Sequence, residues 1–367
     1  MKVAIMGAGV AGLTCALMLE KHGVTADVFE KRGEVGDRFI IAEAMYTMLN
    51  HPFDSVRMFT EQFGIYIKPT SNIRKNFVHT PNKSTYVEGH LGFTNMRGKH
   101  EESLERQLAN QFNGKIHFHS DASYEELLHN YTHVVLATGD ARDTSNIQPF
   151  DKSLAASFKG AIVKGRFHPT EVHTWFNHDF APKGMGYLIP HTNTEASLVL
   201  VYPEYTENEK YVKEELWKRF LDTAEKNIHQ SLEVVSEYEL SNYVIGEARY
   251  PRIGNTLFVG NCYGVINPFL GFGQFISMLT GVYAALDICG VEQYEKLLKP
   301  VKKDYRDSLA LRRALEYMQN PQYDLIAEIL SKEFVGKTLV SPKYSLLKVI
   351  SKAILLVNWQ KGLNQER

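Results

Sequence analysis

Residues Lys2–Glu30 have the sequence "KVAIMGAGVAGLTCALMLEKHGVTADVFE" and indicate the fold class. Its first residues form a short apolar run typical of a buried strand, residues 10–22 have the pattern of a helix that ends at Gly23, and residues 25–31 predict a second strand. A strand, a glycine-rich turn, a helix and a second strand form the first unit of a parallel sheet. We therefore expect an α/β fold.

The turn between the first strand and the helix contains the pattern G-x-G-x-x-G, at Gly7, Gly9 and Gly12. The pattern suits a dinucleotide because the second glycine lets the backbone approach a pyrophosphate, and the helix N-terminus then offers free N–H groups. Glu30 ends the next strand, where a carboxylate accepts hydrogen bonds from an adenosine ribose and repels a 2′-phosphate. NADP is therefore disfavoured at this site, whereas NAD and FAD both remain open. The expected contacts are Gly7, Gly9, Ala11, Gly12, Glu30 and Lys31.

A second glycine-rich strand, turn and helix late in the chain favours FAD. The sequence "FVGNCYGVINPFLGFGQF" (residues 258–275) ends a strand and precedes an apolar helix over residues 273–286. FAD is long, so its ribityl and isoalloxazine groups need a second site. Asn261 suits a ribityl hydroxyl, and the helix N-terminus suits the negative charge of the reduced flavin. The expected contacts here are Gly260, Asn261, Pro268, Gly271, Phe272, Gly273 and Gln274, with Gly139 in the turn after the strand "THVVLA".

The remaining segments divide the chain into three parts. Residues 66–96 and 156–245 are rich in Tyr, Thr, Val and Phe with closely spaced turn signals, which predicts an inserted antiparallel β-sheet domain that binds the substrate. The cofactor-binding domain is then a composite of residues 1–65, 97–155 and 246–295. Residues 296–367 predict a C-terminal helical region.

With these motifs, the chain resembles the geranylgeranyl reductase branch of the FAD-dependent oxidoreductases that share the para-hydroxybenzoate hydroxylase fold. The resemblance covers about residues 1–320. It implies that Arg97 meets the FAD, and that "IAEA" (residues 41–44) corresponds to the family's Cys-x-Glu-Gly, with Ala42 and Ala44 near the cofactor. "PKGMGYLIP" (residues 182–190) corresponds to the family's Pro-Gly-Gly-Tyr-x-Trp-x-Phe-Pro on the sheet that shapes the substrate cavity.

This chain departs from the family's pattern at several positions. Asn261 stands where the family has Asp, and Ile41 stands where it has the cysteine proposed to assist reduction. No catalytic residue is identified. Tyr187, Tyr263 and Cys262 are weak candidates, because a phenol or a thiol near a flavin can supply a proton, although a buried structural role is the more common one.

Composition and charge limit the partners. The chain has 367 residues, 44% of them hydrophobic, and a formal net charge of −1, which gives no field that attracts nucleic acid. The three cysteines form no pattern typical of a set of disulfide bonds, and no apolar run is long enough to span a membrane. A cytoplasmic location is therefore expected. His117 and His119 share an expected strand face, but nothing completes a metal site, so no metal is predicted. Residues 344–362 could lie on a membrane surface, although a helix that caps the cofactor domain is the more common case.

Three functions remain open from the sequence. The first is a reductase, in which NADH, NADPH or a protein partner reduces FAD, and the flavin passes a hydride to a C=C bond of an apolar, isoprenoid-like small molecule. The second is a flavin monooxygenase that hydroxylates an aromatic or apolar compound. The third is a flavin- or NAD-binding module without catalysis, which a protein unable to bind FAD would favour.

Overall fold

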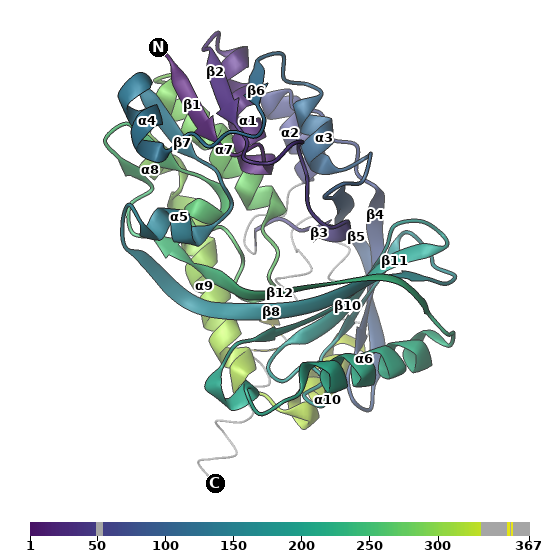
Figure 1. Ribbon diagram of the computed structural model, residues 1–367. Coiled ribbons are helices and arrows are strands. Elements are labelled where there is room, and N and C mark those ends of the chain that lie inside the picture. Colours follow the sequence, from purple (N-terminus) through teal and green to yellow (C-terminus); the bar gives the residue numbers. More distant parts are fainter. Residues whose placement is uncertain (49–53, 332–350, 353, 355–367) are drawn as a thin grey trace.

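The computed structural model describes residues 1–48, 54–331, 351–352 and 354, and in these parts the chain forms two sheets with helices around them (Figure 1). The first sheet has six strands in the order β13-β14-β7-β1-β2-β6 and is parallel except for β13. Its strands are β1 (Val3–Met6), β2 (Ala26–Phe29), β6 (Lys115–His117), β7 (His133–Leu136), β13 (Arg252–Ile253) and β14 (Thr256–Phe258). The predicted α/β class with a Rossmann-like region is confirmed.

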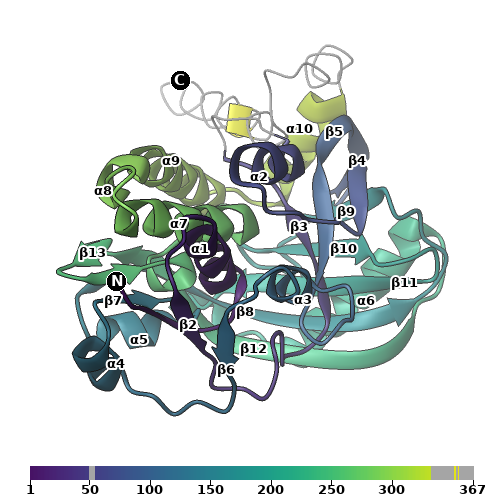
Figure 2. The same ribbon diagram turned by 90° about the horizontal axis from the view of Figure 1, so that it is seen from above.

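Helices cover both faces of the six-stranded sheet, as seen from above in Figure 2. Ile5 in β1 faces α1 and α7, whereas Ala4 packs with Leu127 of α4 on the opposite face. The helices of this part are α1 (Val10–Lys21), α2 (Ser55–Phe63), α3 (Leu104–Ala109), α4 (Tyr124–Asn130), α5 (Ala141–Ser145), α7 (Gln274–Ile288) and α8 (Tyr294–Leu297), with a 3-10 turn at Gly260–Cys262.

The second sheet has eight strands in the order β12-β8-β11-β10-β9-β4-β5-β3. It is antiparallel, as predicted for the inserted sheet, except where β4 runs parallel to β9. Its strands are β3 (Ile41–Met45), β4 (Ser71–His79), β5 (Ser84–Arg97), β8 (Phe150–Lys164), β9 (Glu171–Trp175), β10 (Met185–Pro190), β11 (Glu195–Pro203) and β12 (Glu233–Ala248). The strand β3 lies in residues 1–65, which the sequence assigned to the cofactor-binding domain, yet it pairs with β5 in this sheet.

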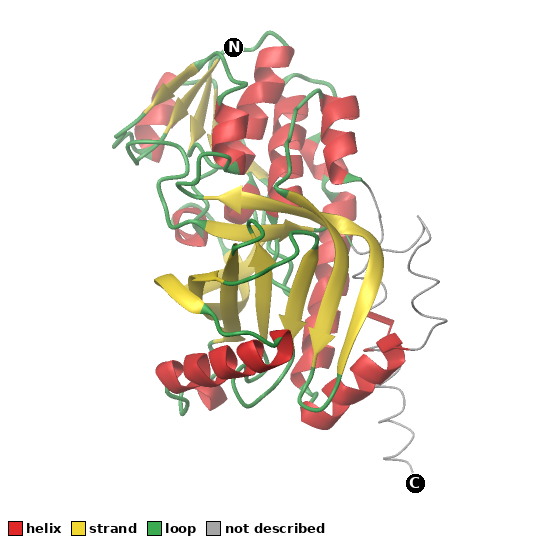
Figure 3. Ribbon diagram, turned by 90° about the vertical axis from the view of Figure 1, so that its right-hand side faces the viewer, coloured by secondary structure: helices red, strands yellow, loops and turns green. Residues whose placement is uncertain are grey.

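One face of the eight-stranded sheet packs against α6 (Lys213–Ile228), which lies along the lower side of the sheet in Figure 1 and in Figure 3. Trp217 and Phe220 of α6 contact Leu188, Leu198 and other residues that point to this side. We call the opposite side, which faces the six-stranded sheet and its loops, the inner face. The prediction for residues 156–245 named a sheet and no helix, so α6 is an element that the sequence analysis missed.

Two long helices connect the region of the first sheet with the second. These are α9 (Lys299–Glu316), which follows α8, and α10 (Asn320–Ser331), which packs on β5. Leu311, Leu315 and Tyr323 belong to the apolar cluster of the eight-stranded sheet. Helices were expected from residue 296 onward, but the stretch proposed to touch a membrane (344–362) lies almost wholly outside the described residues. No helix in the described part of the chain is long and apolar enough to cross a bilayer.

Candidate cofactor and ligand site

The turn between β1 and α1 contains two glycines that the fold itself requires. Gly7 has φ of +111°, and a Cβ on it would lie 2.5 Å from the Ala137 carbonyl oxygen. A Cβ on Gly12 would lie 2.1 Å from the Gly7 carbonyl oxygen, so only glycine lets α1 pack this closely on the turn. Gly9 differs from both, because its φ is −82° and nothing lies within 4 Å of its Cβ position. The fold alone therefore does not explain a glycine at position 9.

Gly9 is the N-cap of α1, and no side chain caps this helix. Free N–H groups and the positive end of the helix dipole therefore meet an open space at Gly9, which is an arrangement that suits a phosphate. Glu30 borders the same turn: its carboxylate accepts hydrogen bonds from the Ala8 amide (2.8 Å) and the Arg32 amide (3.0 Å). Lys31, next to Glu30, is exposed.

The N-terminus of α7 has the same character. Its N-cap is Gly273, which has no capping side chain and a φ of −157°, an extended conformation that any residue can adopt. A Cβ on Gly273 would make only an ordinary contact, 3.5 Å from Ile266. The loop before it is held by Asn267, whose side chain accepts the Phe269 amide (2.9 Å) and donates to the Ser308 hydroxyl (2.7 Å). Gly273 is thus a second uncapped helix start at which the fold does not demand glycine.

The helices α1 and α7 cross in close contact. A Cβ on Gly281 would lie 2.1 Å from the Ala11 carbonyl oxygen, and Thr14 donates to the Met278 carbonyl oxygen over 3.0 Å. Because an α-helix rises 1.5 Å per residue, the two N-caps are separated by about 20 Å at most when measured along both helices through this crossing. An extended dinucleotide can span such a distance. The crossing therefore sets the spacing between the two uncapped helix starts.

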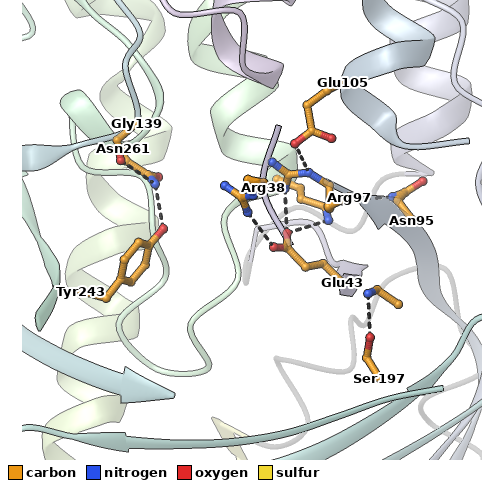
Figure 4. Close-up of polar contacts among 11 residues, drawn as sticks. Arg38, Glu43, Asn95, Arg97, Glu105, Gly139, Ser197, Tyr243 and Asn261 are labelled. Atoms are coloured by element: carbon orange, nitrogen blue, oxygen red, sulfur yellow. Dashed lines mark hydrogen bonds and ion pairs between the residues drawn. The ribbon is translucent and has the colours of Figure 1, made fainter. Parts of the chain in front are cut away.

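A cluster of charged and polar side chains lies beside the N-terminus of α7 (Figure 4). Arg97 at the end of β5 donates to Glu43 of β3 (2.7 Å) and to Glu105 of α3 (2.8 Å). Gln274, the first residue of α7, donates to the same Glu43 carboxylate (2.8 Å) and accepts from Asn95 (3.0 Å). The cluster joins β3, β5, α3 and α7 at one point.

The charges of this cluster hold Glu43 ionised. Burial by itself would raise the pKa of Glu43, but Arg97, Arg38 (3.6 Å away) and Gln274 together hold that pKa below its ordinary value. The contact of Arg97 with a cofactor stays a prediction. Its guanidinium is engaged by two carboxylates, and its clearest effect is to fix the position of Glu43.

Several buried polar atoms of the cluster have no hydrogen-bond partner among the residues that the structure describes. They are the Arg38 Nε, the Asn95 Oδ1 and the Glu105 Oε2. Buried polar atoms are nearly always paired in folded proteins, so unpaired ones gathered in one place point to a polar ligand or water that completes them. The residues present therefore fit the polar ring of a bound cofactor.

The remaining predicted contacts lie around this cluster. Asn261 donates to the Tyr243 hydroxyl (2.8 Å) and to the Gly139 carbonyl oxygen (3.3 Å), which ties the end of β14 to the inner face of the second sheet. Gly260 has φ of +58°, and its amide donates to the Thr280 hydroxyl (2.9 Å). Ala42 and Ala44 lie in β3 beside Glu43, and Phe272 packs edge-on against Tyr46.

A narrow cavity of about 40 Å³ opens on the inner face. The loop residues Pro268–Gly271 form one wall, and Met185, Val201 and Ile245 are among the apolar residues of the other. Arg312 of α9 is the one charged residue in the lining. The cavity is therefore suited to an apolar group.

The three weak catalytic candidates are not gathered at one point. Tyr187 lies on the inner face, in the apolar cluster with Leu270 and Phe272. Tyr263 is buried under the first sheet, where it packs near Tyr294 at 6.4 Å between ring centroids. Cys262 is buried beside the Thr138 hydroxyl (3.2 Å). Burial raises the pKa of each of these three groups, so all of them stay protonated at neutral pH.

Sequence reasoning missed four residues of this region. Glu43 lies within the quoted stretch "IAEA" and could have been found there, since a carboxylate in an apolar strand demands a partner. Glu105, Tyr238 and Tyr243 carry no such signal, because strand register brings the tyrosines to the inner face and the packing of α3 brings Glu105 to Arg97.

The two histidines expected on one strand face do not share a strand, since His117 ends β6 whereas His119 follows it with φ of +51°. The described residues contain no group of side chains suited to a metal ion.

The comparisons with known proteins agree with this architecture. A family model described as an NAD(P)-binding Rossmann-like domain matches residues 5–42, which include the glycine turn and Glu30. A solved structure of a geranylgeranyl bacteriochlorophyll reductase-like protein from Thermoplasma acidophilum matches with a TM-score of 0.73 and 14% identity, over 96% of this chain and 95% of that one.

Two further solved structures come from proteins with other named reactions. A flavin-dependent brominase matches with a TM-score of 0.64 and 12% identity over 100% of both chains. An aklavinone-11 hydroxylase, solved with FAD and aklavinone, matches with a TM-score of 0.58 and 14% identity over 86% of this chain and 68% of that one. The expected resemblance is therefore confirmed at the level of the fold: this chain has the architecture shared by flavin-dependent reductase-like, halogenating and hydroxylating proteins.

Proposed function

We propose that this protein is an FAD-dependent oxidoreductase. The observation that carries the proposal is the pair of uncapped helix starts at Gly9 and Gly273, where glycine is present although neither backbone conformation nor packing demands it. A negatively charged group that approaches each helix N-terminus closely would explain why glycine occupies both positions. FAD has such a group at two well-separated places, the pyrophosphate and the reduced ring.

Each part of the cofactor has a set of residues to hold it in this proposal. The α1 N-terminus at Gly9 would bind the pyrophosphate, and Glu30 would accept the ribose hydroxyls with the lone pairs that its two amide contacts leave free. Asn261 would bind a ribityl hydroxyl. Gly273 and Gln274 would hold the ring edge, and the unpaired polar atoms of the Glu43–Arg97 cluster would be completed there. Bound FAD would supply two-electron transfer, which the side chains present do not supply themselves.

The preferred reaction is the reduction of a C=C bond in an apolar small molecule, with NADH, NADPH or a partner protein as electron donor. The apolar lining of the cavity and the fold shared with a geranylgeranyl reductase-like protein support this choice. The role of this chain's residues is to exclude water from the cavity and to orient the substrate. Since Ile41 replaces the family's cysteine, the proton must come from another group.

A monooxygenase is the second candidate, and the fold shared with an FAD-dependent hydroxylase favours it. Rapid mixing of the FAD-loaded, pre-reduced protein with oxygen separates the two. A reductase is expected to reoxidise without a long-lived oxygen adduct and to consume alkene under anaerobic conditions with NADH or NADPH. A stable oxygen adduct with formation of hydroxylated product would instead establish the monooxygenase.

A further inference from the structure

Tyr238 of β12 carries a hydroxyl that the fold does not use. In the four neighbouring strands β10, β11, β8 and β12, the residues directly opposite one another are Tyr187, Val199, Gly160 and Tyr238. Opposed residues in antiparallel strands point to the same side of a sheet. Tyr238 therefore shares the inner face with Tyr187, and Met185, two residues before Tyr187 in β10, lines the cavity on this face.

Gly160 allows the ring of Tyr238 to lie flat across β8. A Cβ on Gly160 would lie 2.3 Å from the Tyr238 Cζ and 2.4 Å from its hydroxyl oxygen, so any other residue would push the ring away. Phe39 stacks on the ring, with 4.3 Å between centroids and 9° between planes. The glycine below and the phenylalanine stacked on the ring direct the hydroxyl inward, over the middle of the sheet.

The Tyr238 hydroxyl oxygen is buried and has no hydrogen-bond partner among the described residues. Ser197 lies next to it, but the two hydroxyls do not have the geometry of a hydrogen bond. The Ser197 oxygen is already engaged by the Ala42 amide (2.9 Å) and by the His191 Nε2 (2.7 Å). An unpaired buried hydroxyl costs stability, and such groups are rare unless a ligand completes them.

The Nε of Arg38 is also unpaired, and it indicates which kind of group would pair with the Tyr238 hydroxyl. Arg38 precedes the stacked Phe39, and the Cζ of its guanidinium lies 5.7 Å from the centroid of the Phe39 ring. An Arg Nε–H is a donor only, and a phenol O–H is a donor as well, so the shared requirement is an acceptor oxygen. The surroundings on the same face are apolar, because Tyr187 and Met185 pack with Leu270 and Phe272.

We infer that Tyr238, supported by Arg38, is the group that recognises an acceptor oxygen, such as a carbonyl or hydroxyl, on an otherwise apolar substrate. The inference rests on the proposed function, since it places the substrate beside the FAD site. It narrows the substrate class from any apolar small molecule to an apolar molecule that carries an acceptor oxygen. The Tyr238 hydroxyl specifies the substrate, whereas the ring packs between Gly160 and Phe39.

The test compares carvone and limonene, which share a carbon skeleton but differ in that only carvone carries a carbonyl oxygen. FAD loading of the wild type is measured first, so that a failure of the proposed function is seen separately. Dissociation constants of both compounds are then obtained from changes in the flavin spectrum for the wild type, for Tyr238→Phe and for the exposed control Tyr250→Phe. Thermal melting of the FAD-free proteins gives a readout that does not depend on the cofactor.

The wild type and Tyr250→Phe are expected to bind carvone about tenfold more tightly than limonene, as for one hydrogen bond to a buried donor. Tyr238→Phe should bind both equally, with unchanged FAD affinity and an unchanged or higher melting temperature, since it removes an unpaired polar atom. The inference is overturned by a preference that survives in Tyr238→Phe, by binding of neither compound to the FAD-loaded wild type, or by a lowered melting temperature. A change in FAD affinity would overturn it too, because the hydroxyl would then contact the cofactor.

Discussion

Substituting two glycines of the same motif should give opposite outcomes, because only one of them is required by the fold. In Gly12→Ala the new methyl would lie 2.1 Å from the Gly7 carbonyl oxygen, so α1 or the turn must move. Overpacking of this kind typically costs roughly 1–3 kcal/mol, and a backbone atom as the obstacle places the cost at the upper end. In Gly9→Ala the methyl enters an open space at an ordinary φ of −82°.

The expected stability of Gly9→Ala is close to that of the wild type. Alanine is a poorer N-cap than glycine, but it also reduces the conformational entropy of the unfolded chain, and each effect is worth roughly 0.5–1 kcal/mol with opposite sign. FAD affinity should nevertheless fall about 10- to 100-fold, because a charge-assisted hydrogen bond between the helix N-terminus and a phosphate is worth roughly 1.5–3 kcal/mol.

Urea denaturation of the FAD-free proteins and quenching of FAD fluorescence on binding measure the two effects separately. Gly12→Ala should lose stability, whereas Gly9→Ala should lose FAD affinity with its unfolding midpoint nearly unchanged. The reasoning is refuted if Gly9→Ala binds FAD within about twofold of the wild type, a difference of only about 0.4 kcal/mol. It is also refuted if Gly12→Ala is as stable as the wild type.

Three further predictions concern ionisable side chains and depend on how deeply each is buried. Glu43→Gln leaves the buried Arg97 with one charged partner fewer, so the free energy of unfolding measured in urea should fall by about 3 kcal/mol. A fall of less than about 1 kcal/mol would contradict a structural ion pair. Burial lowers the pKa of His79 to about 3 and that of His173 to about 4, so the unfolded chain takes up more protons below the ordinary pKa of 6.5. The urea midpoint should therefore fall between pH 7 and pH 4, and a constant midpoint would show that the pair is not buried. Only Cys289 is partly exposed, so a thiol reagent should titrate one cysteine in the native protein and three after unfolding; two or more fast native thiols would contradict the packing.

The local chemistry of the first βαβ unit was predictable because it depends on neighbours in the sequence. A glycine turn, a helix of the right period and a carboxylate about twenty residues later fixed the parallel start of the sheet, and β1 and β2 are paired as expected. The same holds for α7 after its glycine-rich loop.

Pairings between distant segments were not predictable in the same way. The short strand β3 pairs with β5 in the second sheet, with Ile41 opposite Arg97, and no local pattern near Ile41 indicates that partner. The helix α6 was missed because its charged residues lie in a segment whose overall composition favours strands, and the apolar stripe of Leu216, Trp217 and Phe220 identifies it only when read at helical spacing.

The candidate site shows the same limit. The backbone positions of a cofactor site could be named from the motifs, because glycine at a helix start is a local signal. The side chains that complete the site could not, since the engagement of Arg97 by Glu43 and Glu105 and the position of the Tyr238 hydroxyl over Gly160 depend on strand register.

The most direct test of the central claim is a calorimetric titration of the purified wild-type protein, freed of any bound nucleotide, with FAD. The account predicts one FAD per chain, bound more tightly than NAD, because only FAD engages both the Gly9 and the Gly273 helix starts. Absence of FAD binding, or equal affinity for FAD and NAD, would contradict the claim that both helix starts hold a single cofactor.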